Sequence, residues 1–387
     1  MPDKYTAREM LTKLVAFNTI SKNSNLQIID FIEEYLSGYG ITCHRVPNAE
    51  GDKSSLYAQI GPDVEGGVVL SGHTDVVPVE GQDWVTDPFE LIEKDGKLFG
   101  RGSCDMKGFL SLGLSMLPEM LAADLKVPIQ LAFSYDEEVG CLGAPPMIAD
   151  MADRFPRAKA VIVGEPSMMQ VVTGHKGIAE IETIVHGFEV HSSLIHTGVS
   201  AIMTAAKLIN WHTDQLAENA ENIKPIAVEL GYVPPYTTLH NGVIHGGTAH
   251  NITAKECRFL TDIRTLPDEN LLDWIAKYKA FAKTLEAEIQ TIRPEASIEI
   301  NVRATVEGLA PETDGGAEAL ARALTGDNAD HVVSYATEGG QFQQGGYSTI
   351  VCGPGSIDQA HQPNEFIAIS QLQAGEAFIR KIIEHLS

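Results

Sequence analysis

The sequence predicts an α/β domain, with a mixed and mostly parallel sheet flanked by helices, into which a smaller α+β domain is inserted. The chain has 387 residues, which is more than one hydrophobic core usually supports, so two domains are expected. Short apolar runs such as Val68–Leu70 and Ala160–Val163 are typical of buried parallel strands. Alternating apolar and polar residues further along indicate antiparallel strands with one exposed face. We therefore expect the main domain at 1–174 and 307–387 and the inserted domain at 175–306.

The first part of the main domain alternates helices with strands. Helical spacing of apolar residues predicts helices over 6–17, 24–36 and 109–117. Apolar runs predict strands over 55–60, 68–70, 127–135 and 160–163. The glycines at 38 and 40 should end the second helix, and Pro118 should stop the third. Residues 83–98 have no clear period and are expected to be irregular, and the glycines in 100–108 permit a tight loop.

The inserted domain follows a different pattern of strand, helix, strand, strand, helix and strand. These elements are expected over 178–185, 201–216, 236–245, 257–263, 268–289 and 297–303. Together they predict a four-stranded antiparallel sheet with two helices. The α/β pattern then resumes with a helix over 317–324, a glycine-rich loop at 338–340, a strand over 349–352 and a closing helix over 371–386.

Composition excludes several classes of function. The formal net charge is −24, from 28 basic and 52 acidic residues, which argues against a nucleic-acid partner. No apolar run reaches membrane-spanning length, so no membrane association is expected. The five cysteines show no CxxC spacing, which argues against disulfides and a thiolate zinc site. The polar N-terminal residues, with a capping box at Thr6 and Glu9, do not resemble a secretory signal, and we expect a cytoplasmic protein.

The segment SGHTDVVP at 71–78 is the clearest candidate for a functional site. A short apolar strand ends here and places His73 and Asp75 at its carboxyl end, two residues apart and so on the same side. A metal-binding imidazole usually has its second nitrogen held by a carboxylate. We interpret His73 as a metal ligand and Asp75 as its orienting partner. The alternative, from these two residues alone, is a strand-end histidine capped by a neighbouring aspartate.

Four more acidic or histidine residues also lie in segments that follow apolar runs or precede a helix. They are Asp105, Glu138, Glu165 and His361. In open α/β sheets, ligands bind outside the carboxyl ends of the strands, where these groups should converge. Taken singly, Asp105 could be a helix cap, and the acidic run 136–138 could be a solvated turn.

Two imidazoles and three carboxylates exceed what one catalytic zinc takes from a protein, and they suit borderline divalent ions such as Zn²⁺ or Co²⁺. With Asp105 bridging, each of two ions would have one histidine, one glutamate and a share of Asp105. Two such ions can activate a bridging water and polarise a carbonyl. Glu137 is left free to take the proton from that water and deliver it to a leaving amine, which predicts amide hydrolysis. A nucleophilic cysteine at Cys104 or Cys141 has no supporting motif.

The strings SGHTDVVP, GRGSCDMKG, DEEVG, GEPS and AHQPNE occur in this order over nearly the whole chain. They resemble the family of dinuclear zinc amidohydrolases and exopeptidases that includes acetylornithine deacetylase, succinyl-diaminopimelate desuccinylase, aminoacylase and glutamate carboxypeptidase. The resemblance implies that His73, Asp105 and Glu165 bind one metal and that Asp105, Glu138 and His361 bind the other. It implies Glu137 as the general acid/base.

The resemblance also implies roles for the inserted domain as a lid and as the dimerisation domain of a homodimer. His191, in the string HSS, would stabilise the oxyanion, supplied across the dimer. Arg264 and Asn251 lie in segments that resemble those binding the substrate's α-carboxylate, although Arg264 could instead pair with Asp262.

Within the family the motifs look most like those of acetylornithine deacetylases, which implies hydrolysis of N-acetyl-L-ornithine to L-ornithine and acetate. Glu338 would then meet the free ammonium group of the substrate. The alternatives are a related N-acyl-amino-acid amidohydrolase or a carboxypeptidase or dipeptidase with the same site. A catalytically silent metal-binding dimer is the alternative of a different class, and the presence of Glu137 with all five ligands argues against it.

Overall fold

The computed structural model describes residues 4–387, and the chain divides into two compact units. The first unit takes the chain up to Gly174 together with Leu309–His331 and Thr337–Ser387. The second takes His175–Gly308 and Val332–Ala336. The second unit therefore gains a short segment from beyond residue 306 that the sequence pattern had not indicated.

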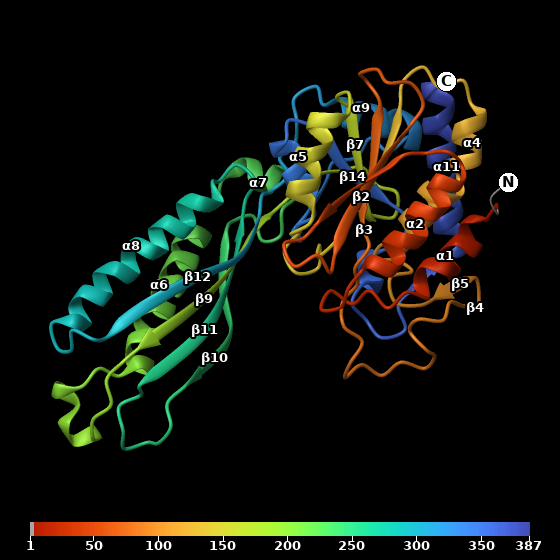
Figure 1. The fold of residues 1–387 in the computed structure, drawn as a ribbon. Coiled ribbons are helices and arrows are strands. Elements are labelled where there is room, and N and C mark those ends of the chain that lie inside the picture. Colours follow the sequence, from red (N-terminus) through yellow and green to blue (C-terminus); the bar gives the residue numbers. More distant parts are fainter. Residues whose placement is uncertain (1–3) are drawn as a thin grey trace. The chain divides into compact units, whose positions relative to one another are not determined.

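The first unit supplies all but His175, Val332 and Val333 of an eight-stranded sheet in the order β1-β2-β6-β3-β7-β14-β8-β13 (Figure 1). The strands span Cys43–Pro47 (β1), Ser54–Ile60 (β2), Val68–His73 (β3), Ile129–Ser134 (β6), Ala160–Pro166 (β7), Val172–His175 (β8), His331–Val333 (β13) and Thr349–Gly353 (β14). Strands β6, β3, β7 and β14 form a parallel centre, and β2 pairs antiparallel with both β1 and β6. The predicted α/β fold is confirmed.

Helices cover both faces of this sheet. They span Ala7–Val15 (α1), Leu26–Gly38 (α2), Lys107–Ser115 (α3), Leu117–Ala122 (α4), Ala144–Arg154 (α5), Gly316–Thr325 (α9), Gly339–Gln344 (α10) and Ile369–Leu386 (α11). Strand β2 shows the two faces: Leu56 joins the large apolar core, whereas Tyr57 turns the other way and donates its hydroxyl to Asp150 of α5. The first helix begins with the predicted capping box of Thr6 and Glu9.

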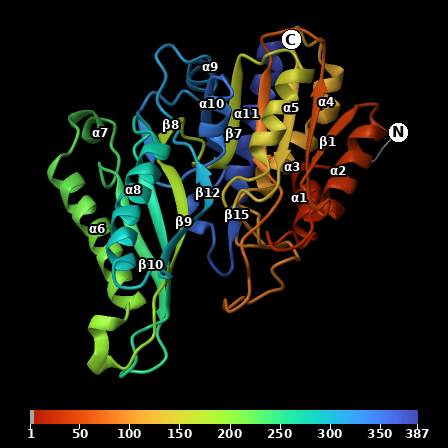
Figure 2. The same ribbon diagram turned by 60° about the vertical axis from the view of Figure 1, so that its left-hand side comes forward.

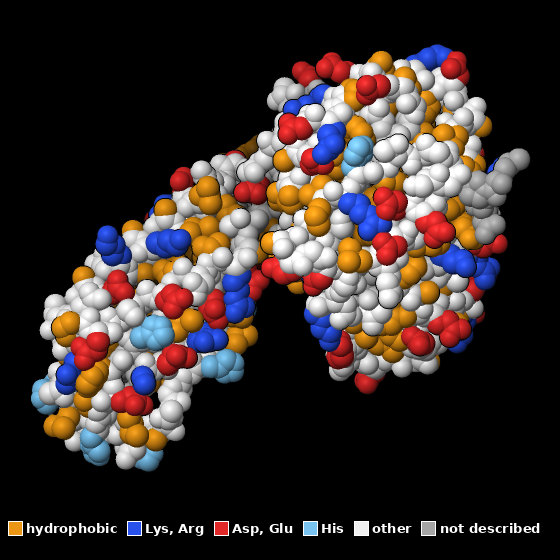
Figure 3. All heavy atoms as spheres, in the orientation of Figure 1, with side chains coloured by type: hydrophobic (Ala, Val, Ile, Leu, Met, Phe, Trp, Pro, Cys, Tyr) orange, Lys and Arg blue, Asp and Glu red, His pale blue; other side chains and the backbone are white. Residues whose placement is uncertain are grey.

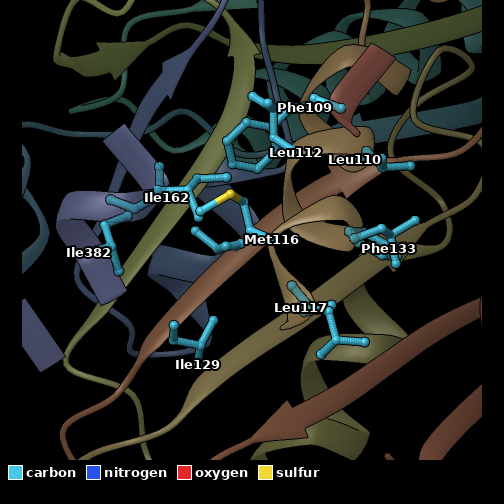
Figure 4. Packing of buried hydrophobic residues seen from close by; sticks show 14 of the residues in the cluster. Phe109, Leu110, Leu112, Met116, Leu117, Ile129, Phe133, Ile162 and Ile382 are labelled. Carbon is cyan, nitrogen blue, oxygen red and sulfur yellow. The ribbon is translucent and has the colours of Figure 1, made fainter. Parts of the chain in front are cut away.

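The large apolar cluster that includes α3 lies on one face of the first unit's sheet. Figure 4 shows Phe109, Leu110 and Leu112 of α3 among side chains of β6, β7 and α11. The contact with β7 is close, because a Cβ on Gly164 would lie 2.0 Å from the ring of Phe109. This packing fixes α3, and with it the loop before α3, against the strands.

Some elements differ from those predicted. Helix α5 was missed, and it begins with a proline pair in its first turn, where proline needs no N–H partner. Pro118 likewise begins α4 instead of only ending α3. The segment predicted as irregular contains Ile92–Lys94 (β4) and Lys97–Phe99 (β5), which form a small sheet with Phe366–Ala368 (β15). The glycine-rich loop at 338–340 opens helix α10.

The second unit contains a four-stranded antiparallel sheet in the order β10-β11-β9-β12. Its strands span Gly177–His186 (β9), Thr238–Gly246 (β10), Glu256–Thr265 (β11) and Ser297–Val306 (β12). Helices α6 (Ala201–Glu221) and α8 (Leu271–Gln290) run along one face of this sheet (Figures 1 and 2), and α7 spans Pro225–Glu229. Inward side chains such as Phe259 and Tyr278 form its separate core. The predicted α+β pattern is confirmed.

The surface carries charged side chains of both signs. On the face that Figure 3 shows, lysine and arginine side chains are interspersed with acidic ones rather than gathered in one patch. Over residues 4–387, none of the helices combines the length and the apolar character that crossing a bilayer requires.

Candidate metal centre

The parallel register brings the predicted ligands to one edge of the first unit's sheet. His73 ends β3 opposite Ser134, the last residue of β6, so Glu137 and Glu138 follow just beyond that edge. Ser71 pairs with Val163 of β7, which places Glu165 level with His73 on the neighbouring strand. The hydrophobic runs that form these strands therefore also fix the spacing of the charged residues that follow them.

His73 contacts two of the other predicted ligands. His73 Nε2 is 3.0 Å from Asp105 Oδ1 and 3.5 Å from Glu165 Oε1. All three side chains are buried. His73 and Glu165 are held at strand ends, whereas Asp105 comes from the glycine loop before α3. This is the group expected to hold the first ion.

The second group forms around the other oxygen of Asp105. His361 Nε2 lies 3.3 Å from Asp105 Oδ2 and 2.9 Å from Glu138 Oε2. His361 differs from the other ligands because it sits on a loop with a positive φ of 62° and its side chain is 52% exposed. Asp105 thus contacts a histidine on each side, as a bridging carboxylate requires.

Two buried carboxylate oxygens without hydrogen-bond partners indicate that this group of residues is suited to binding cations. Among the described residues, Glu138 Oε1 and Glu165 Oε1 are buried without a hydrogen-bond partner, a costly arrangement unless something positive is bound. Ligand atoms of His73, Asp105 and Glu138 lie within 4.8 Å of one another, and so do those of His73, Glu137 and Glu165. Neutral imidazole and carboxylate donors suit divalent zinc or cobalt.

Burial shifts the acid–base behaviour of the carboxylates. It raises the pKa of Glu138 to about 7, and the nearby charge of Asp105 adds to the shift. It also raises the pKa of Glu165 well above its ordinary range. Hydrogen bonds to Asp105 and Glu138 raise the pKa of His361 to about 10. Burial opposes ionisation of Asp105, but hydrogen bonds from His361 and His73 lower the pKa of Asp105 below its usual value.

Glu137 lies next to this centre, with a carboxylate oxygen within 4.8 Å of the ligand atoms of His73 and Glu165. Burial raises its pKa to about 8, with the neighbouring acids adding to the shift. Its Oε1 accepts a weak hydrogen bond from the Cys141 thiol at 3.3 Å. A carboxyl group whose pKa lies near neutrality can both accept and return a proton, as a general acid/base must.

Asp75 acts through different atoms from those predicted. His73 Nδ1 lies 2.9 Å from the backbone carbonyl of Asp75 and 3.6 Å from its Oδ1, so the carbonyl is the acceptor that orients the ring. The carboxylate instead accepts from the N–H of Glu137 (3.1 Å), the N–H of Glu138 (3.3 Å) and the hydroxyl of Ser21 (2.8 Å). One residue therefore orients both a ligand and the acidic turn.

Glu338 is placed where it does not fit contact with a substrate's ammonium group. Its side chain is 0% exposed, and its two oxygens accept hydrogen bonds from the hydroxyls of Ser71 (2.5 Å) and Ser134 (2.7 Å). Burial raises its pKa. The glycines that suggested an open loop instead begin helix α10, so Glu338 ties β3 and β6 together behind the candidate ligands.

The remaining predicted residues belong to the second unit. His191 is exposed, and its Nδ1 contacts Ser193 Oγ at 2.8 Å. Asn251 is also exposed. Arg264 Nε donates to both carboxylate oxygens of Asp262 at 2.9 Å, which is the alternative that the sequence left open. An internal ion pair reduces the availability of this guanidinium to a ligand.

Sequence reasoning missed two buried charged residues inside the motif strings. Arg101 and Glu365 are each 1% exposed and form an ion pair of 2.8 Å. The signal was present, because a charged residue in a segment with metal-ligand candidates has to be either solvated or paired. Arg101 and Glu365 lie more than two hundred residues apart in the chain, so the local sequence pattern could not show that they pair.

Comparison with known proteins agrees with this geometry. The sequence model of Peptidase family M20/M25/M40 matches residues 69–385. The chain is 32% identical to an acetylornithine deacetylase of Myxococcus xanthus over 98% of this chain and 97% of the relative. It is 33% identical to that of Proteus mirabilis (strain HI4320), over 97% and 96%. A tripeptidase from Staphylococcus aureus subsp. aureus Mu50 shares the fold, with a TM-score of 0.75 at 20% identity over 100% of this chain and 99% of the other.

Proposed function

The chain belongs to Peptidase family M20/M25/M40, and we propose that it hydrolyses N-acetyl-L-ornithine to L-ornithine and acetate. The observation that carries this proposal is the gathering of two histidines and three carboxylates at one sheet edge, with Glu137 beside them. The enzyme would be a metal-dependent amidohydrolase. The two relatives compared at 32% and 33% identity are both named acetylornithine deacetylase, which supports this substrate over other acylated amino acids.

Two divalent ions, which we propose to be Zn²⁺ with Co²⁺ as a substitute, would polarise the amide carbonyl. They would also lower the pKa of a water, so that it can lose a proton and attack the carbonyl carbon. His73, Asp105 and Glu165 would hold one of them. Asp105, Glu138 and His361 would hold the other. The buried oxygens of Glu138 and Glu165 support this assignment, because one oxygen of each has no hydrogen-bond partner among the described residues.

Glu137 would move the proton in this reaction. It would take a proton from the attacking water as the new carbon–oxygen bond forms. It would then give that proton to the nitrogen as the carbon–nitrogen bond breaks, so that ornithine leaves as an amine. The second proton of the water is lost from the acetic acid formed, which leaves acetate. Its raised pKa, about 8, supports both halves of this role near neutral pH.

Residues of the second unit would complete the enzyme. We propose that His191 stabilises the oxyanion and that Asn251 contributes to binding the α-carboxylate, as the family resemblance implies. Arg264 could join Asn251 only by leaving Asp262. We also propose that the second unit mediates a homodimer. Exposed apolar residues support this: Ile202 and Met203 on α6, and Val243 and Ile244 on the edge strand β10.

A substrate panel tests the proposal. The purified protein, loaded with Zn²⁺ or Co²⁺, should show its highest kcat/KM with N-acetyl-L-ornithine among N-succinyl-diaminopimelate, N-acetylmethionine, N-acetylcitrulline and dipeptides. Removal of metal with a chelator should abolish activity, and added Zn²⁺ or Co²⁺ should restore it. A preference for dipeptides would favour the peptidase alternative, for which the similarity in fold to the tripeptidase is the supporting observation. Size-exclusion chromatography with light scattering tests the dimer.

A further inference from the structure

One buried carboxylate joins the loop that carries Asp105 to the loop that carries His361. Glu365 is 1% exposed and follows His361 by four residues. Its Oε1 accepts hydrogen bonds from the backbone N–H groups of Cys104 (2.8 Å) and Asp105 (3.0 Å). Its Oε2 accepts from the backbone N–H of Gly102 (3.0 Å). A single side chain thus binds three amides in the segment that presents the bridging ligand.

Arg101 extends this connection into a closed circuit. Its Nη1 donates to Glu365 Oε2 at 2.8 Å, and its Nη2 donates to Gln82 Oε1. Gln82 Nε2 in turn donates to the backbone carbonyl of His361 at 2.8 Å. The chain of contacts therefore starts at the Asp105 backbone and returns to the His361 backbone. The guanidinium also lies over the ring of Trp84, with 5.1 Å from its carbon to the ring centroid.

We propose that Glu365 is a positioning residue that sets the separation of Asp105 and His361. The two ligand groups differ in how they are otherwise fixed. His73 and Glu165 end strands whose register is set by the sheet, whereas His361 is a half-exposed residue on a loop. Loss of Glu365 should therefore weaken binding of the ion held by Asp105, Glu138 and His361 more than binding of the other ion. This inference rests on the proposed metal-dependent function.

Glutamine is the informative replacement because it keeps the shape of the side chain and removes half of its acceptors. Whichever way the amide turns, its NH₂ group faces two N–H donors that a carboxylate oxygen accepted before. Glu312 provides the matched control. Its carboxylate also accepts several hydrogen bonds, from Gln343 Nε2, Ser348 Oγ and the N–H of Thr349, but it serves the start of β14.

The test is a Zn²⁺ titration of the metal-free full-length protein against a competing chromophoric chelator, which gives an affinity for each ion. The affinity that His361→Ala weakens identifies the ion held by Asp105, Glu138 and His361. Glu365→Gln should weaken binding of that ion about 10- to 100-fold and change the affinity for the other ion by less than about threefold. Glu312→Gln should leave both within about threefold. Gln82→Ala, which removes the half-buried side chain at the His361 end of the circuit, should weaken binding of the same ion.

Equal weakening of both ions by Glu365→Gln, or no weakening, would overturn the inference. If Glu365→Gln does not fold, Gln82→Ala decides: no selective loss at the His361 side also overturns it. Failure of the proposed function looks different, because then the unaltered protein would bind no pair of ions or would leave acylated amino acids intact.

Discussion

Replacing Asp75 by asparagine should reduce kcat/KM moderately, because the carboxylate holds the acidic turn and does not hold the ring of His73. The His73 ring donates to the Asp75 carbonyl, which the substitution keeps. The carboxylate oxygens accept from Glu137 N–H on one side and from Glu138 N–H and Ser21 Oγ on the other. An asparagine that keeps its oxygen towards the pair of donors loses only the bond to Glu137.

The expected size follows from that single lost contact. A hydrogen bond to a charged group is worth about 1.5–3 kcal/mol. At about 1.4 kcal/mol for each factor of ten, the loss in kcat/KM should be about 10- to 100-fold. If the carboxylate instead selected the tautomer of His73, the loss should reach about 10⁴-fold, the size seen when an orienting aspartate of a catalytic triad is amidated.

The assay is steady-state hydrolysis of N-acetyl-L-ornithine by D75N at saturating Zn²⁺. Ser21→Ala is the matched control, because it removes the hydroxyl donor to the same carboxylate and leaves the hydrogen bonds from the backbone N–H groups of Glu137 and Glu138. It should lower kcat/KM less than D75N does, because the Ser21 hydroxyl lies outside the acidic turn and the backbone of that turn keeps its acceptors. A D75N enzyme with unchanged kcat/KM, or one reduced by about 10⁴-fold, would refute the assignment of carbonyl and carboxylate to separate tasks.

Three further predictions concern chemistry and stability. Glu137→Gln should lower kcat by about 10²- to 10⁴-fold while metal content, measured by elemental analysis, stays unchanged; loss of metal would contradict a proton-transfer role. Gly164→Ala should lower the free energy of unfolding in urea by about 1–3 kcal/mol, because its Cβ would meet the Phe109 ring, whereas Gly113→Ala in α3 has room and should not destabilise. Burial lowers the pKa of His212 from 6.5 to about 4. The free energy of unfolding in urea should therefore fall by about 3 kcal/mol as the pH falls from 6.5 to 4, because the unfolded chain binds a proton that the buried imidazole does not. The His212→Gln variant should lack this part of the pH dependence.

The candidate ligands His73, Glu138 and Glu165 were predictable because each ends or follows a strand that the sequence shows clearly. The apolar strands before His73 and Glu165 leave little doubt about where each strand ends, and parallel pairing brings such ends together. Helix α5 was not predictable in this way, because its opening prolines are typical of a break as well as of a first turn. Strands β4 and β5 have three residues each, too few to show an alternation.

Other features depended on atoms rather than on residue types. The sequence placed Asp75 beside His73, but it could not tell which oxygen of Asp75 would face the ring. The sequence also could not show that Glu338 is enclosed by two serine hydroxyls from different strands. The partners of Glu365 lie some 260 positions earlier in the chain, so its contacts appear only once the fold is known.

The raised pKa values of Glu138 (about 7) and His361 (about 10) favour protons on these two candidate ligands near neutral pH when no cation is bound. Uptake of a divalent cation would release these protons, together with that of His73, whose pKa is also raised. Loading should then acidify a weakly buffered solution, and the apparent affinity for metal should weaken as the surroundings become more acidic.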